Sequence, residues 1–181
     1  MTSHPARRDG RSWSDDEARF DVSNRLFFRL YQASNLMHKT GSRAVAEYGT
    51  TTQQWAVLGA LSRPAAAKQG VTVKELMEFL MVSRQNLTAL LNRLEASGLI
   101  ERTRGAEDGR IRRVRLTGKG TRTWSRMLVN IRAYYRAATA DFTAEEGLLL
   151  FRLLDRLTKR LSQLQGPSGL DATLTPPSLQ E

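Results

Sequence analysis

The sequence of 181 residues contains no cysteine and only two histidines, His4 and His38. Without a thiol there is no disulfide framework, no thiolate zinc site, no iron–sulfur cluster and no cysteine nucleophile. With two histidines, one of them in a polar leading segment, a histidine-based metal site or catalytic triad is not expected either. No cluster of carboxylates takes its place. We therefore expect no metal, no cofactor and no enzymatic activity.

Long hydrophobic runs are also missing. No stretch approaches 18 uncharged apolar residues, the length at which a membrane-spanning helix is considered. The first twenty residues contain arginines but no apolar core of a signal peptide. We therefore expect a soluble, intracellular protein, with one domain flanked by tails and long enough to bury its own core.

Positive charge is in excess, and it is concentrated. The chain has 28 Lys and Arg against 18 Asp and Glu, a formal net charge of +10. Within residues 83–126 eleven basic residues stand against four acidic ones, so this window holds most of the imbalance. Most of these basic residues are Arg, which suits phosphate and base-edge contacts. The alternative to a nucleic-acid contact is a solvated basic face. The local sequence pattern distinguishes these two interpretations.

The hydrophobic spacing predicts a mainly α-helical protein with a small β-hairpin. Capping-box patterns begin at Thr51, Thr72 and Thr143, where a Gln or Glu follows three residues later. The expected helices are 21–48, one that starts at 51 and stops at Pro64, 72–80, 83–97, 117–140 and 143–164; 65–70 is expected as a loop, and 99–104 and 111–116 as strands. The segments 1–20 and 166–181 are expected to be disordered tails.

The helix expected at 83–97 has two distinct faces. Its leucines, Leu87, Leu90, Leu91 and Leu94, fall on one side at helical spacing. The opposite side and its flanks carry polar or small residues suited to base edges and phosphates: Ser83, Arg84, Gln85, Asn86, Thr88, Ala89, Asn92 and Arg93. No acidic residue interrupts 83–94, and the small Ala89 would allow close approach to bases. The plain alternative is an amphipathic helix with a solvated outer face.

The expected hairpin has a basic rim. Its arginines are Arg102, Arg104, Arg110, Arg112, Arg113 and Arg115. Arginines are favoured in a narrow minor groove by its negative potential. Asp108 lies two residues before Arg110 and could hold its guanidinium in one pose, or could act as a turn former ahead of Gly109. We expect Asp108, Arg110 and Arg112 to contact DNA.

A helix, a tight turn, a second helix and a basic hairpin form the layout of a winged helix-turn-helix. The segment TVKELMEFLMVSRQNLTALLNRLEASGLIERTRGAEDGRIRRVRLTGKG resembles that of the MarR family of bacterial transcriptional regulators. The resemblance covers roughly 22–164, and its most specific parts are LEASGLIER, Asp108-x-Arg110 and LTGKG. The family's wing usually begins with Asp-Pro and has Arg between the Asp and the final Arg. This chain has Gly105-Ala106 and Gly109 at those positions.

The resemblance implies a homodimer in the bacterial cytoplasm, associated with the nucleoid, that represses by binding a pseudo-palindromic double-stranded DNA operator. The family domain would occupy 21–165, with dimerisation helices at 21–48 and 117–165 and the winged helix-turn-helix at 51–116. The apolar face expected at 143–164 is wider than one neighbouring helix would cover, which also favours a dimer.

The resemblance further implies a small-molecule effector that binds between the dimerisation helices and the DNA-binding lobe and releases the DNA. TTQQWAVLGALSRP and MVSRQNL are similar to the branch controlling hydroxycinnamate-type aromatic catabolism. The effector would then be an aromatic acid or its coenzyme A thioester. The candidate ligand residues are Tyr31, Asn35, His38, Arg43 and Trp55. A core role for Trp55, and surface or dimer contacts for His38 and Arg43, remain open.

Two other function classes remain open. One is a helical protein-interaction dimer in which the three-helix lobe is only a scaffold. The other is a basic protein that adheres to RNA or to an acidic membrane without sequence preference. Salt dependence and sequence preference separate these from a specific DNA-binding regulator.

Overall fold

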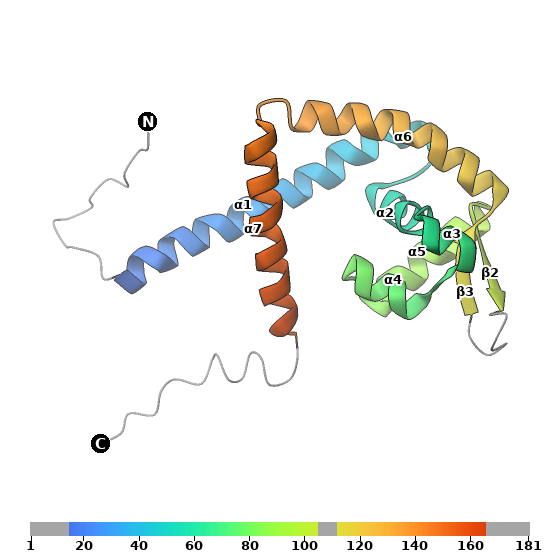
Figure 1. The fold of residues 1–181 in the computed structure, drawn as a ribbon, viewed down its shortest axis with the longest axis horizontal. Coiled ribbons are helices and arrows are strands. Elements are labelled where there is room, and N and C mark those ends of the chain that lie inside the picture. The colour runs from blue at the N-terminus through green and yellow to red at the C-terminus, as the bar shows by residue number, and fades with distance from the viewer. Residues whose placement is uncertain (1–14, 105–111, 166–181) are drawn as a thin grey trace, which may run out of the picture. The chain divides into compact units, whose positions relative to one another are not determined.

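A computed structural model describes residues 15–104 and 112–165. Figure 1 shows the elements, which are α1 (Asp15–Ala44), η1 (Ala46–Tyr48), α2 (Thr52–Leu61), α3 (Pro64–Gln69), β1 (Val71–Thr72), α4 (Val73–Leu80), α5 (Arg84–Ala96), β2 (Ile100–Arg104), β3 (Arg112–Leu116), α6 (Gly118–Ala138) and α7 (Ala144–Gln163). The expected fold class, mainly helical with a small hairpin, is confirmed. The chain divides into two compact units between Tyr134 and Tyr135, inside α6.

The three predicted capping boxes are confirmed. At Thr72 the hydroxyl accepts from the Glu75 backbone N–H at 3.2 Å, and the Glu75 carboxylate accepts from the Thr72 N–H at 2.7 Å. Thr51 with Gln54 and Thr143 with Glu146 repeat the arrangement. The hydrogen bond from the Thr72 backbone lowers the pKa of Glu75 because it stabilises the charged carboxylate. These caps satisfy N–H groups that helix starts leave without a partner.

The first helix differs from its expected bounds of 21–48. It begins at Asp15, with Asp15, Asp16 and Glu17 in its first turn. Negative charge at a helix N-terminus is stabilised by the helix dipole, which favours the earlier start. The helix ends at Ala44, and a 3-10 turn follows to Gly49, which adopts a left-handed conformation with φ of 64°. The expected stop at Gly49 is thus reached through a tighter last turn.

The expected loop at 65–70 is wrong, because most of it is the helix α3. The sequence pattern predicts Pro64 only as the stop of the preceding helix. In the structure Pro64 occupies the first turn of α3. Backbone N–H groups in the first turn have no carbonyl partner within the helix, so the N–H that proline lacks costs no hydrogen bond there. Gly70 follows with φ of 69° and leads into β1, a two-residue strand that the sequence did not indicate.

The strands form one antiparallel sheet in the order β1-β3-β2. In the hairpin Ile100 lies opposite Leu116, Arg102 opposite Val114 and Arg104 opposite Arg112. On the other side of β3, Val71 pairs with Val114. The short strand β1 therefore ties the hairpin to the start of α4.

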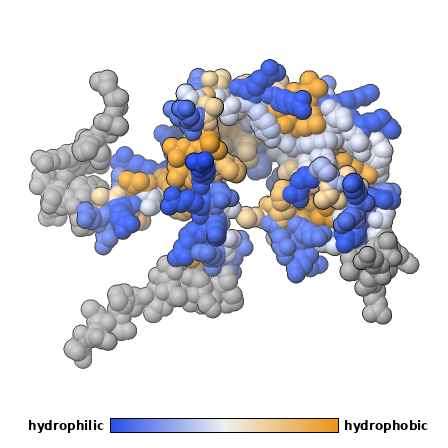
Figure 2. Space-filling model, in the orientation of Figure 1, coloured by the Kyte–Doolittle hydropathy of each residue, from blue (hydrophilic) through white to orange (hydrophobic). Residues whose placement is uncertain are grey.

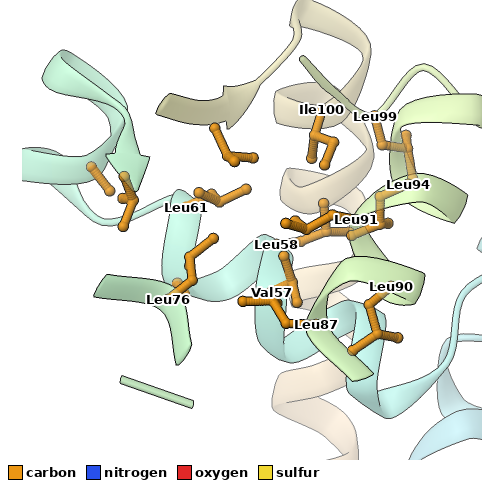
Figure 3. Close-up of a cluster of buried hydrophobic side chains, with 14 of the residues drawn as sticks. Val57, Leu58, Leu61, Leu76, Leu87, Leu90, Leu91, Leu94, Leu99 and Ile100 are labelled. Carbon is orange, nitrogen blue, oxygen red and sulfur yellow. The ribbon is translucent and has the colours of Figure 1, made fainter. Parts of the chain in front are cut away.

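One core holds the first unit together. Its centre consists of side chains from α2, α4 and α5, joined by Leu99 just before the hairpin and by Ile100 at the start of β2, as Figure 3 shows. Val114 of β3 and Met127 and Ile131 of α6 complete it. Leu58, Leu61, Leu76, Leu87 and Leu94 have no exposed surface. Each buried leucine contributes about 1.5–3 kcal/mol relative to an exposed one.

The long helices leave most of their apolar residues outside this core. In α1 only Gly41 is buried, and in α7 no residue is buried. Figure 2 shows orange, hydrophobic surface on these helices among the blue of their charged residues. The exposed apolar side chains are Phe20, Val22, Leu26, Phe27, Phe28, Tyr31, Leu36 and Met37 on α1, and Leu148, Leu149, Leu150, Phe151, Leu153, Leu154 and Leu161 on α7.

Gly120 allows α6 to approach the segment between α5 and β2. A Cβ atom built on Gly120 would overlap the backbone carbonyl of Leu99, which cannot move without disturbing the sheet. Gly118, two residues earlier in the same helix, is exposed, and its Cβ would meet only the flexible Arg122 side chain at 3.5 Å.

We therefore expect Gly120→Ala to lower the free energy of unfolding by about 1–3 kcal/mol, as for other insertions into packed positions. Gly118→Ala is the matched control and should be neutral or slightly stabilising, because it only restricts the unfolded chain. Urea denaturation followed by circular dichroism measures both. Equal stability of the two variants would contradict the close approach.

Candidate nucleic-acid interface

The turn between α4 and α5 is short and well defined. Met81 ends α4 in a left-handed conformation with φ of 53° and donates its N–H to the Met77 carbonyl. Two residues later the Ser83 hydroxyl accepts from the Asn86 N–H at 3.3 Å and so begins α5. The predicted helix start at Ser83 is confirmed. This turn fixes the direction in which α5 leaves α4.

The two faces predicted for α5 are both present. Leu87, Leu90, Leu91 and Leu94 are buried. All the residues predicted on the opposite face are exposed, namely Ser83, Arg84, Gln85, Asn86, Thr88, Ala89, Asn92 and Arg93. The Thr88 hydroxyl donates to the Arg84 carbonyl at 2.7 Å, so its proton is engaged inside the helix while its oxygen remains an acceptor.

Asn92 belongs to a small polar network at the end of this face. Arg102 of β2 donates from Nη2 to Asn92 Oδ1 at 2.7 Å, and from Nη1 to a carboxylate oxygen of Glu95. The Arg102 side chain is 24% exposed and the Glu95 side chain 38% exposed. Glu95 is the first acidic residue after the acid-free stretch 83–94. Its ion pair with Arg102 offsets its negative charge.

The remaining arginines of the hairpin have different surroundings. Arg113 is partly buried and donates to the Gly70 carbonyl at 3.2 Å, and Arg115 pairs with Glu101 at 2.7 Å. Both therefore have partners within the unit. Arg112 is exposed at the start of β3. Asp108 and Arg110 lie outside the described residues.

The predicted ligand residues separate into two groups. His38 and Trp55 lie at the contact between α1 and α2, where Trp55 is half-buried and His38 is exposed. Tyr31, Asn35 and Arg43 are exposed elsewhere along α1. His38 Nδ1 is 2.8 Å from the Thr52 hydroxyl. The ring of Trp55 meets that of Tyr134 edge-on, with centroids 6.0 Å apart.

Gly41 brings these side chains together. A Cβ on Gly41 would be 2.5 Å from the Thr52 methyl, 3.2 Å from the Trp55 ring and 3.7 Å from the Tyr134 ring. Ser42 adds a hydroxyl 3.3 Å from that of Thr52. We call His38, Ser42, Thr52, Trp55 and Tyr134 the α1–α2 cluster. It combines two aromatic rings with three polar side chains.

Sequence reasoning missed several of these residues. Thr52 and Ser42 look like an ordinary first-turn residue and a helix-end residue, and Tyr134 lies about 80 residues further along the chain. Arg102 was counted only as one of the basic residues of the hairpin. No spacing rule pairs it with Asn92, because the contact depends on how the strand passes the helix.

Over 15–104 and 112–165, His, Asp and Glu side chains nowhere gather in threes that could hold a metal ion. None of the helices in these ranges has the length and apolarity required to cross a membrane.

Comparisons with known proteins agree with this geometry. A family model described as MarR family matches residues 48–111. The chain is 47% identical over 150 residues to the transcriptional activatory protein BadR of Rhodopseudomonas palustris, covering 80% of this chain and 85% of that protein. It is 31% identical over 130 residues to the homoprotocatechuate degradative operon repressor of Escherichia coli, covering 72% and 85%.

Among solved structures, the fold is similar to that of a MarR mutant of E. coli crystallised with operator DNA. The TM-score is 0.67 at 24% identity, over 76% of this chain and 96% of that chain. The matched family model, the extent of the similarity to curated regulators and the shared fold agree with the helix-turn-helix and hairpin described above. The chain belongs to the MarR family of transcriptional regulators.

Proposed function

We propose that two copies of this protein bind a pseudo-palindromic operator through α5 and the hairpin, and that a small aromatic acid or its coenzyme A thioester releases them. The observation that carries the proposal is the exposed face of α5, which is polar and free of acids from Ser83 to Leu94. The direction of regulation is left to experiment, because the relatives include an activatory protein and a repressor.

The α5 face has the chemistry that major-groove recognition requires. Gln85, Asn86 and Asn92 carry amides that can form hydrogen bonds with base edges, and Arg84 and Arg93 can bind guanine or phosphate. Ala89 leaves space for close approach. Because the leucines fix the opposite face in the core, these side chains project together from a rigid helix.

The hairpin would add contacts beside the groove. Arg112 is exposed, and we assign it to the DNA backbone. The predicted pair Asp108 and Arg110 keeps its proposed role at the minor groove, although it lies outside the described residues. Arg113 and Arg115 are engaged within the unit, so we assign them to holding the hairpin rather than to DNA.

Dimerisation through α1 and α7 is supported by their exposed apolar residues. Phe28 is 62% exposed, and Phe151 is 65% exposed. Contiguous apolar surface of this kind marks protein interaction sites. A second copy of the chain covers such surface symmetrically, and symmetry matches two α5 helices to two operator half-sites.

The effector would bind at the α1–α2 cluster. Trp55 and Tyr134 offer aromatic faces and edges, while His38 and Thr52 offer polar groups for a carboxylate or carbonyl oxygen. The printed name of one relative refers to degradation of homoprotocatechuate, which is an aromatic acid. This supports an aromatic acid or its thioester as the class of effector.

Release would follow from a population shift. The two α5 helices must be about 34–36 Å apart, one turn of B-DNA, to enter successive major grooves. A ligand that binds better to dimers with another spacing lowers the population that fits. A coupling of about 1–3 kcal/mol is typical of such regulation.

Selection from a random duplex library, followed by titration of the best duplex, tests DNA recognition. We expect binding about 10³–10⁷ times tighter than to unrelated duplex. Gln85→Ala should lose about 1–3 kcal/mol and relax preference at one position of each half-site. Arg112→Ala should weaken all duplexes alike and reduce the salt slope by about one.

The matched control for these variants is Gln69→Ala, at an exposed position of α3 that belongs neither to α5 nor to the hairpin. It should bind the selected duplex like the unchanged protein. Weak binding to every duplex, abolished by salt and with no selected sequence, would overturn the proposed function.

Sedimentation equilibrium tests the dimer. Phe151→Glu places a charge on the apolar face of α7 and should convert the dimer to a monomer whose fold is retained, because Phe151 is 65% exposed within one chain. Gln163→Glu introduces the same charge at an exposed polar position of the same helix and should remain dimeric. A monomeric unchanged protein, or a dimeric Phe151→Glu variant, would contradict this dimer.

Fluorescence anisotropy of the selected duplex tests the effector. Benzoate, 4-hydroxycinnamate and their coenzyme A thioesters are added in turn, and we expect at least one to lower DNA affinity about 5- to 150-fold. His38→Ala should weaken that response, whereas Ser34→Ala, at an exposed position of α1 outside the candidate ligand residues, serves as the comparison. If none of the four compounds changes DNA affinity, this effector class is wrong.

A further inference from the structure

We propose that Arg102 is a positioning residue that determines what Asn92 recognises. Its guanidinium holds the Asn92 amide by the oxygen, so that Asn92 presents only its N–H₂ group to a base. This inference rests on the proposed binding of α5 in the major groove. It goes beyond that proposal by naming the chemistry of one recognised base edge.

The orientation of the Asn92 amide follows from donors and acceptors. A guanidinium carries N–H donors and no acceptor, so only the amide oxygen can face it. The Arg102 Nη2 to Asn92 Oδ1 distance of 2.7 Å fits a charge-assisted hydrogen bond. A flipped amide would bring two donor groups together. The oxygen is therefore directed toward β2, and the nitrogen lies on the other side of the amide carbon.

Glu95 fixes Arg102 from a second direction. It accepts from Nη1 while Asn92 accepts from Nη2, so the planar fork is held at both ends. Asn92 and Glu95 are three residues apart on α5 and hence neighbours along that helix. Arg102 is 24% exposed, which leaves it less accessible to a phosphate than the exposed Arg112.

The consequence is a restricted base preference. The pairing of Asn with adenine uses both amide groups, which meet the adenine N6 and N7 atoms. With its oxygen held by Arg102, Asn92 donates to an acceptor alone: purine N7, guanine O6 or thymine O4. Cytosine, whose major-groove edge offers an N4 donor, is excluded at this position.

The test uses the full chain and the duplex selected by the unchanged protein. Asn92→Ala first identifies the base pair that Asn92 recognises in each half-site. Arg102→Lys keeps the charge but not the fork, and Arg102→Met combined with Glu95→Gln removes both charges together. We expect each to lose preference at that base pair alone, by about tenfold, with an unchanged salt slope.

Base analogues test the donor-only contact. If the recognised base is an adenine, its 7-deaza form should lower affinity as much as Asn92→Ala does, and removing its 6-amino group should have no effect. A preference for cytosine, or an equal loss on removing the 6-amino group, would overturn the assignment. Arg115→Met removes the neighbouring ion pair with Glu101 and should leave base preference unchanged.

Three other outcomes are distinguishable. If the Arg102 variants weaken every duplex equally and lower the salt slope, Arg102 is a phosphate contact and the inference is wrong. If they change only the melting temperature and select the same sequence, the network is merely structural and the inference is again wrong. If the unchanged protein selects no sequence at all, the proposed function itself fails.

Discussion

Burial of the four leucines of α5 is the constraint on which the rest depends. Leu87, Leu90, Leu91 and Leu94 lie within the core beside α2 and α4, so the helix cannot rotate about its axis without exposing them. That one restriction sets the direction of every polar side chain on the opposite face. It also places the end of α5 beside β2, where Arg102 reaches Asn92 and Glu95. The direction of this exposed polar face is thus a consequence of packing.

The hairpin is tied to the same core by ordinary sheet chemistry. Val114 is fully buried at the centre of β3 and pairs with Arg102 on one side and Val71 on the other. Gly120 brings α6 against the Leu99 carbonyl just before the hairpin begins. The hairpin strands therefore leave the lobe from a fixed base, and these contacts define their position relative to α5.

Local patterns predicted most of this architecture. The leucine spacing of α5 and the three capping boxes are visible in the sequence because each depends on residues within one or two helical turns. The six-residue helix α3 and the two-residue strand β1 were missed, since elements so short have no periodicity of their own and depend on tertiary contacts. Pro64 was ambiguous for a physical reason: a proline that ends one helix is equally suited to begin the next.

The candidate sites likewise contain a part that local sequence patterns predict and a part that only the folded chain shows. The exposed face of α5 follows from helical geometry and was predicted residue by residue. The contact of Arg102 with Asn92 was not, because it joins a strand to a helix across a turn and requires the actual backbone path. The α1–α2 cluster brings Thr52 and Tyr134 together around Gly41, and only the folded chain shows that convergence.

Because Gly41 is the single buried residue of α1, a small rotation at that contact produces a large displacement at the other end of the helix. Gly41 lies near its C-terminal end, and the other 26 residues back to Asp15 extend about 39 Å from that contact at 1.5 Å per residue. A tilt of about 5° around Gly41 would displace the far end by about 3 Å on the same geometry. A change of side-chain packing at Thr52 and Trp55, too small to disturb the core, is thereby magnified to the scale on which one protein surface slides past another.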